Sequence, residues 1–152
     1  MEPLAINEIT DLANNWYRML DVHAPFETVL PLVAEDGFQI RIPEGTYRGR
    51  DGFKQVYEEG WIRHFFDETH ELKQLNFTPA GDKAEVKVVV NWQARSWNPP
   101  EPRSKEININ AYQTWVVQRS PGQGQPVILT YTVDLLEPIP SSDSRPPMNI
   151  TS

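Results

Sequence analysis

The amino-acid sequence predicts an α+β fold, in which helices come first and an antiparallel sheet follows. Apolar residues recur at three- and four-residue spacing over residues 5–22, which indicates an amphipathic helix. From residue 69 onward the pattern changes to alternation with a period of two, most clearly over residues 83–97. Turn residues separate the alternating segments, at 79–82, 98–102 and 120–126. Strands joined in this way form an antiparallel meander, and helices placed before the meander are typical of α+β domains.

The first half of the chain is predicted to contain three helices. The first buries an apolar stripe made of Ile9, Leu12, Ala13, Trp16 and Leu20. Pro25 suits the first turn of a second, shorter helix that runs to Val33. Asp51 is a candidate N-cap for the third helix. Gly60 within that helix predicts close packing, because glycine weakens a helix by about 1 kcal/mol relative to alanine.

Short strands are predicted at residues 38–42 and around Tyr47, before the third helix. In the meander, the alternation predicts which side chains share a face of the sheet. It places Leu72 on the opposite face from Leu75 and Phe77. It gives the last strand a single face made of Val127, Leu129, Tyr131, Val133 and Leu135.

Composition and charge restrict the class of protein. The chain has 152 residues, which suits one domain, expected over residues 1–138 and followed by a Pro/Ser-rich tail, 139–152, expected to be disordered. It has no cysteine, so thiolate chemistry and disulfides are excluded. The net charge of −7 argues against nucleic-acid binding, which needs a basic surface. No apolar run approaches the roughly 18 residues of a membrane span, and acidic residues near the N-terminus argue against a signal peptide, so we expect a cytoplasmic protein.

Several short motifs, in a fixed order, carry a resemblance to a known superfamily. They are Trp16-Tyr17-Arg18-Met19-Leu20-Asp21, Val33-Ala34-Glu35-Asp36-Gly37, Tyr47-Arg48-Gly49-Arg50-Asp51-Gly52-Phe53, Thr69-His70-Glu71-Leu72 and Gly81-Asp82-Lys83-Ala84-Glu85-Val86. In this order and spacing, over roughly residues 5–137, the chain resembles the nuclear transport factor 2-like superfamily. The branch it is most similar to contains polyketide cyclases, ketosteroid isomerases and scytalone dehydratases.

The resemblance implies a fold, a pocket and an assembly. Its members wrap a curved antiparallel sheet into a cone, and three N-terminal helices close that cone around a pocket. They commonly form dimers through the sheet and use no cofactor, so the resemblance implies a small organic ligand, a homodimer and no cofactor here.

The catalytic residues of the superfamily carry over only in part. Isomerases of this kind place a tyrosine where this chain has Trp16, and a general-base aspartate where it has Ile42. Isoleucine has no proton to transfer, so the resemblance does not imply steroid isomerisation. Scytalone dehydratases carry an aspartate and a histidine at the positions of Asp21 and His70. Their second histidine, on the next strand, has no counterpart, because residues 83–152 contain no histidine.

Asp21 and His70 are therefore the candidate catalytic residues, as a carboxylate that orients an imidazole for proton transfer. The alternative is that Asp21 simply ends the first helix and His70 begins a strand. A metal site is not expected, because His23, His64 and His70 lack the i, i+4 spacing of a helical metal pair.

An excess of large aromatic side chains indicates an aromatic-lined cavity for a flat or apolar ligand. Ordinary filling of the core by bulky side chains is the alternative. The candidate ligand-binding residues are Trp16, Tyr17, Tyr47, Trp61, Trp92, Gln113 and Trp115.

The other face of the long strands is polar but carries little charge. It includes Asn91 and Gln93, with Tyr112 across the hairpin. Few charges and several amides suit a subunit interface, and a solvated face is the alternative.

Three functions remain open from the sequence. The first is a cofactor-free enzyme of the dehydratase, cyclase or hydrolase type that acts on a small apolar or aromatic compound. The second is a ligand-binding module without turnover, and the third is a domain whose sheet docks another protein.

Overall fold

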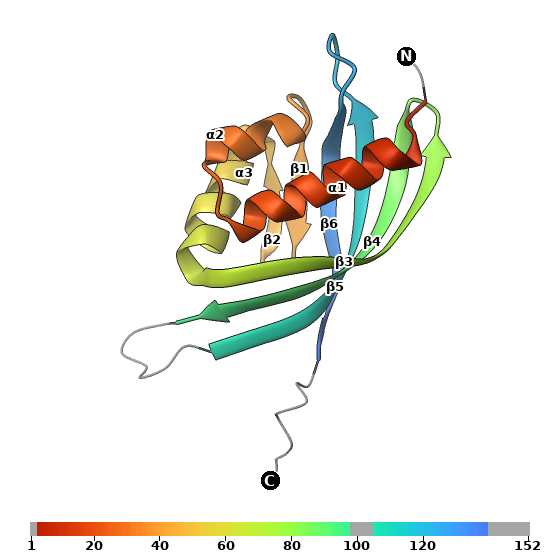
Figure 1. Cartoon of the computed structure of the whole chain (residues 1–152). Coiled ribbons are helices and arrows are strands. Elements are labelled where there is room, and N and C mark those ends of the chain that lie inside the picture. Colours follow the sequence, from red (N-terminus) through yellow and green to blue (C-terminus); the bar gives the residue numbers. More distant parts are fainter. Residues whose placement is uncertain (1–2, 98–104, 140–152) are drawn as a thin grey trace.

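The computed structural model describes residues 3–97 and 105–139, and Figure 1 shows their arrangement. The elements follow in the order α1 (Ile6–Asp21), α2 (Phe26–Val29), a 3₁₀ turn (Leu30–Leu32), β1 (Gln39–Ile42), β2 (Gly45–Arg48), α3 (Gly49–Lys54), a π-helical stretch (Gln55–Ile62), β3 (Phe65–Ala80), β4 (Lys83–Ser96), β5 (Lys105–Arg119) and β6 (Pro126–Pro138). The predicted order of helices, short strands, helix and meander is confirmed.

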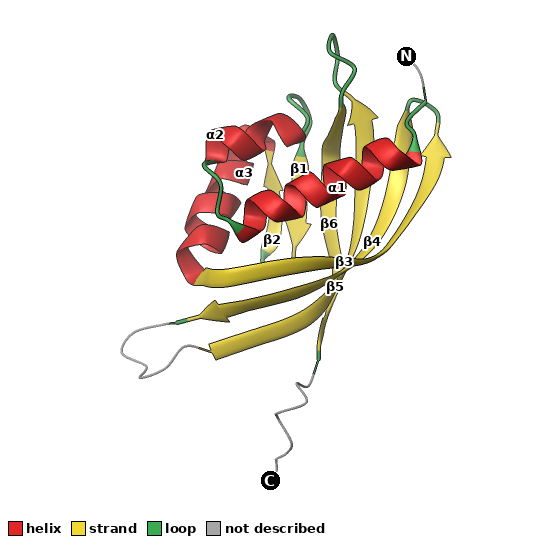
Figure 2. Ribbon diagram, in the orientation of Figure 1, coloured by secondary structure: helices red, strands yellow, loops and turns green. Residues whose placement is uncertain are grey.

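The strands form one sheet in the order β2-β1-β6-β5-β4-β3. The sheet is curved and unclosed, and the helices lie together on one face of it (Figures 1 and 2). Its neighbouring strands are antiparallel, apart from β1 and β6, which pair in parallel from Gln39 opposite Thr130. The predicted α+β fold is therefore confirmed, with one parallel pairing that the sequence pattern did not predict.

Helix α1 crosses the sheet with its predicted apolar stripe buried. Ile9 and Trp16 are fully buried, and Leu12 is 5% exposed. At the start of the helix, Glu8 accepts a hydrogen bond from the backbone N–H of Ala5. It also forms an ion pair with Arg119 at the end of β5. The hydrogen bond from Arg119 holds the pKa of Glu8 below its usual range. These contacts tie the first turn of α1 to the sheet.

Trp16 lies at the centre of the core. Its ring is 5.2 Å from that of Tyr131 and 5.8 Å from that of Phe53, measured between centroids. The ring of Trp115, on strand β5 of the sheet, lies 6.3 Å from the ring of Trp16. A single indole therefore connects α1 to α3 and to the two central strands.

The third helix differs from its prediction at its N-cap and at Gly60. It begins at Gly49, with Arg48 as N-cap, and Asp51 lies in the first turn, where a carboxylate interacts favourably with the helix dipole. A Cβ placed on Gly60 would meet nothing within 4 Å, so the predicted close packing there is wrong. Close packing occurs instead at Gly52, whose Cβ would lie 3.0 Å from the carbonyl carbon of Tyr47.

Irregular pairing shifts the alternation of β3. The register changes between Leu72 and Gln74, which leaves one extra residue in β3. As a result Leu72, Leu75 and Phe77 all pack against the core, and the prediction that Leu72 lies on the opposite face is wrong.

A second irregularity affects β6. The pairs Val116–Thr130 and Val117–Ile128 leave Leu129 as the extra residue. Ile128 is consequently the fully buried side chain, and Leu135 at the far end of β6 is 54% exposed. The predicted face is confirmed for Val127, Leu129, Tyr131 and Val133, which pack in or against the core, and it is wrong only at Leu135, which follows a second extra residue at Asp134.

No helix in the described part of the chain is long and apolar enough to cross a membrane. The predicted loop at 98–102 and the predicted tail lie outside the described residues, except for Ile139, whose N–H donates to the carbonyl of Asn108. The extent of the domain, 1–138, and the disorder of the tail stay predictions.

Gly52 and Gly60, in the third helical region, make a matched test of this packing. We expect Gly52→Ala to lower the free energy of unfolding by roughly 1–3 kcal/mol, because the new methyl group meets the backbone of Tyr47. Gly60→Ala should raise it by up to about 1 kcal/mol, because the methyl group enters open space. Urea denaturation measures both, and equal stability of the two variants would contradict the contact at Gly52.

Candidate active site

A cavity of about 650 Å³ lies between the helices and the sheet. It is lined by residues of the end of α1, the β1–β2 turn, the π-helical stretch and strands β3 to β6. Five of the candidate site residues line it: Tyr47, Trp61, His70, Trp92 and Gln113. Segments from both halves of the chain thus meet around one hollow.

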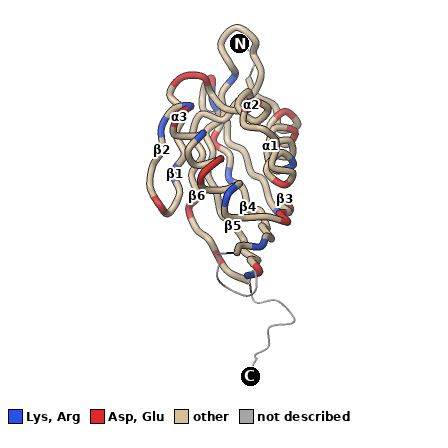
Figure 3. The backbone as a smooth tube through the Cα atoms, turned by 90° about the vertical axis from the view of Figure 1, so that its left-hand side faces the viewer, with Lys and Arg blue, Asp and Glu red and all other residues tan. Residues whose placement is uncertain are grey.

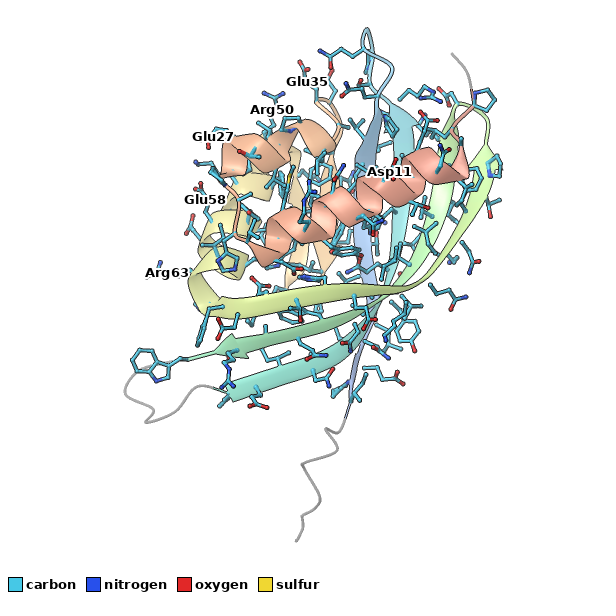
Figure 4. All side chains as sticks on the ribbon, viewed as in Figure 1. Asp11, Glu27, Glu35, Arg50, Glu58 and Arg63 are labelled. Carbon is cyan, nitrogen blue, oxygen red and sulfur yellow. The ribbon has the colours of Figure 1, made fainter. Side chains whose placement is uncertain are left out.

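The π-helical stretch forms one wall of this cavity. A π-helix is wider than an α-helix and often occurs at functional sites. Here it brings Gln55, Tyr57, Trp61 and Ile62 into the lining. The charged side chains labelled on the helices, including Glu58 and Arg63, point outward instead, away from the sheet (Figure 4).

Asp21 and His70 are in direct contact, as the sequence analysis predicted for a catalytic pair. Asp21 Oδ1 lies 2.6 Å from His70 Nδ1, and Asp21 Oδ2 accepts the backbone N–H of His70 at 3.2 Å. The side chains of His70 and Asp21 are 9% and 24% exposed. The carboxylate at the end of α1 therefore fixes both the backbone and the ring of His70 on β3.

Two aromatic rings hold the imidazole plane. The ring of Tyr17 lies 5.2 Å from that of His70 at an interplanar angle of 16°, and the ring of Trp92 lies 6.2 Å away at 19°. Since Asp21 occupies Nδ1, the nitrogen that remains for a ligand in the cavity is Nε2.

Gln113 connects the cavity to the core through a buried network. Its Oε1 accepts hydrogen bonds from Tyr17 Oη at 2.6 Å and from Trp115 Nε1 at 3.1 Å. Its Nε2 donates to Tyr131 Oη at 2.9 Å. Burial raises the pKa of Tyr17 and the pKa of Tyr131 well above their ordinary value, so both hydroxyl groups stay neutral.

The remaining aromatic candidates divide into two groups. Tyr47, Trp61 and Trp92 line the cavity. Trp16, Tyr17 and Trp115 are buried beside it and are not among its lining residues. Ligand contact by any of these side chains, and catalysis by Asp21 and His70, stay predictions.

Sequence reasoning missed a second histidine–carboxylate contact in the same cavity. His23 Nε2 contacts Glu68 Oε2, and Glu68 Oε1 accepts a hydrogen bond from Trp92 Nε1 at 3.0 Å. Both residues line the cavity. The signal was present in the spacing, because residues two apart on a strand share a face, and Glu68 precedes His70 by two.

The charged groups around the cavity are acidic or imidazole. Glu44, Glu59 and Glu68 line it together with His23, His64 and His70. Lys and Arg are absent from the lining within the described residues.

Over the whole described backbone, in contrast, basic and acidic positions are interspersed (Figure 3). Among residues 3–97 and 105–139, no group of three or more acidic, histidine or cysteine side chains is placed to hold a metal ion.

Comparison with known proteins identifies the architecture. No family model matches the sequence, and no curated protein matches it. Solved structures do match in shape. A hexachlorocyclohexane dehydrochlorinase (LinA) of type 2 has a TM-score of 0.72 at 16% identity, covering 93% of each chain. The chain has the nuclear transport factor 2-like fold.

Two further structures are similar over comparable lengths. A putative dehydratase of this superfamily from Streptomyces avermitilis has a TM-score of 0.69 at 16% identity, covering 90% of this chain and 97% of its own. A putative aromatic ring hydroxylase from Novosphingobium aromaticivorans has a TM-score of 0.73 at 17% identity, with 90% and 96% covered. The resemblance seen in the sequence is thus confirmed for the fold.

Alkaline titration tests the burial of the tyrosines. Burial, together with the nearby charges of Glu68 and Glu58, raises the pKa of Tyr57 to about 12. A tyrosine that ionises near pH 10 when unfolded therefore keeps its proton longer in the folded protein. Since the unfolded state then binds fewer protons, stability should fall as the pH rises from about 10 to about 12.

We expect Tyr57→Phe to lose less stability than the parent protein over that range. At pH 7 the variant should be slightly less stable, by roughly 0.5–1.5 kcal/mol, because it lacks the hydrogen bond from Tyr57 Oη to the carbonyl of Ala24. Denaturation curves at a series of pH values measure both effects. Parallel pH dependence in the two proteins would show that Tyr57 ionises normally.

Proposed function

We propose that this chain is a cofactor-free lyase, in which His70 removes a proton from carbon and Asp21 supports the imidazole. The observation that carries the proposal is the 2.6 Å contact between the two side chains at the wall of a large cavity. A carboxylate that accepts the Nδ1 proton leaves the lone pair on Nε2 free to act as a base. It also stabilises the imidazolium that forms when Nε2 takes up a proton.

The lining of the cavity favours a small, uncharged, apolar or aromatic substrate. Trp61, Trp92 and Tyr47 offer flat apolar surfaces, and Gln113 offers a buried amide. A carboxylate or phosphate substrate would need a cationic partner, and the charges lining the described cavity are glutamates and histidines. The dehydrochlorinase and the dehydratase that share this fold are consistent with elimination chemistry.

A generic elimination substrate tests the proposal without knowledge of the natural one. The ring proton of 5-nitrobenzisoxazole needs only a base for its removal, and the N–O bond then breaks to give a coloured nitrophenolate. We expect the protein to accelerate this reaction by about 10²-fold or more, the scale of one positioned base. Asp21→Asn should lower kcat by at least about tenfold, because the imidazole loses its orienting carboxylate.

Asp82→Asn is the matched control, because Asp82 lies in the exposed turn between β3 and β4 with its side chain 84% exposed. Its rate should equal that of the parent protein. A parent protein that binds the compound, seen as quenching of tryptophan fluorescence, without accelerating its reaction would contradict a lyase. That result would favour the ligand-binding module instead.

We also propose a homodimer through the face of the sheet that bears Asn91, Gln93 and Tyr112. On this face the amides satisfy one another, since Asn91 Nδ2 donates to Asn108 at 2.9 Å and Gln93 Nε2 donates to Asn91 at 2.9 Å. A polar face with few charges is less costly to remove from water than a densely charged one.

Sedimentation tests this assembly. The protein should sediment as a dimer at micromolar concentration, and Gln93→Glu should shift it toward monomer, because a two-fold axis repeats the added charge. Glu85→Gln, also on the exposed side of β4, should leave the mass unchanged. A monomeric parent protein would contradict the dimer and would leave the sheet face open for a different partner.

A further inference from the structure

The cavity contains a second histidine–carboxylate pair that the proposed reaction does not yet use. His23 and Glu68 are in contact, and their side chains are 26% and 6% exposed. Both line the same cavity as His70. A carboxylate this deeply buried is costly in free energy unless other groups pair with it, and the imidazole of His23 contacts one of its oxygens.

The two pairs are built from the same two segments, but each segment supplies the carboxylate to one pair and the histidine to the other. Asp21 and His23 lie two residues apart at the end of α1, and Glu68 and His70 lie two residues apart on β3. In one pair the helix end supplies the carboxylate, and in the other it supplies the histidine. His23 also adopts a positive φ of 51°, which is uncommon for residues other than glycine and is often found at functional sites.

The hydrogen bonds of Glu68 determine what it can do. One oxygen faces His23 and the other accepts the N–H of Trp92, so both are engaged. Glu68 is thus placed to stabilise the imidazolium of His23 rather than to take a proton from a substrate itself. An imidazolium with Nε2 directed at Glu68 retains a second N–H, on Nδ1, for another acceptor.

We propose that His23 is a catalytic acid that protonates the leaving group while His70 acts as the base. This inference rests on the proposed lyase function. His70 Nε2 takes the proton from carbon, the C–H electrons form the new double bond, and the bond from the neighbouring carbon to oxygen breaks. His23 gives its Nδ1 proton to the departing oxygen, which leaves as water, and solvent then resets the two histidines.

An acid, His23, beside a base, His70, also indicates the class of substrate. Halide ions leave without a proton, whereas a hydroxyl group leaves readily only when it is protonated. A dedicated acid beside the base therefore points to an uncharged alcohol whose hydroxyl group lies on the carbon next to an acidic C–H. On this basis the reaction is a dehydration.

Two benzisoxazoles that differ in the basicity of their leaving oxygen test the role of His23. The phenolate released from unsubstituted 1,2-benzisoxazole is more basic than the one released from the 5-nitro compound, so it gains more from a proton donor. We expect His23→Asn and Glu68→Gln to lower kcat/KM on the unsubstituted compound at least about tenfold more than on the nitro compound. Asp21→Asn, which affects the base, should lower both by similar factors.

The variants are chosen to preserve the fold. Asparagine adopts positive φ more readily than most residues, which suits position 23, and glutamine at position 68 can still accept the N–H of Trp92. Glu71→Gln, at an exposed site on β3, is the matched control and should leave both rates unchanged. Thermal melting checks folding, and Glu68→Gln alone suffices if His23→Asn does not fold.

The outcomes separate this inference from the function on which it rests. If the parent protein accelerates neither compound, the lyase function itself is wrong. If it accelerates both, and the His23 and Glu68 variants lose equal factors on the two compounds or lose nothing, His23 is not the acid. A larger loss on the unsubstituted compound in both variants supports the assignment.

Discussion

The contact between the end of α1 and the middle of β3 is the constraint on which the candidate site depends. Asp21 binds the backbone and the ring of His70, so helix and strand are held in one register at that point. Helix α1 is held in this position on the sheet because Trp16 is packed between α3 and the central strands. A shift of α1 along the sheet would therefore separate Asp21 from His70 and, at the same time, disrupt the packing of Trp16 in the core.

Elements that depend on local periodicity could be predicted from the sequence. The stripe of α1 and the alternation of β4 are confirmed, because helix and strand periods follow from the backbone alone. The breaks in the alternation of β3 and β6 could not be predicted. Extra residues near Lys73 and at Leu129 are set by pairing with β4 and β5, which no single segment encodes.

The candidate site was only partly visible in the sequence. Asp21 and His70 came from the resemblance, and nothing in their own segments indicates that the two would meet. The aromatic residues could not be sorted, because a cavity wall and a core select the same apolar side chains, and only the fold separates Trp92 from Trp115. His23 was hidden because it follows a helix end, where a histidine usually signals only termination.

The parallel pairing of β1 with β6 has a consequence for how the chain acquires its structure. Ile40 pairs with Tyr131, so the hairpin of β1 and β2 joins the sheet only through the last strand. Until β6 has left the ribosome, that hairpin has no further strand to pair with, and the wall of the cavity near Tyr131 is missing. Contacts so distant in sequence form slowly, which makes the pairing of β1 with β6 a late event in folding. The cavity is thus completed only when β6 has joined the sheet, and the nascent protein lacks it.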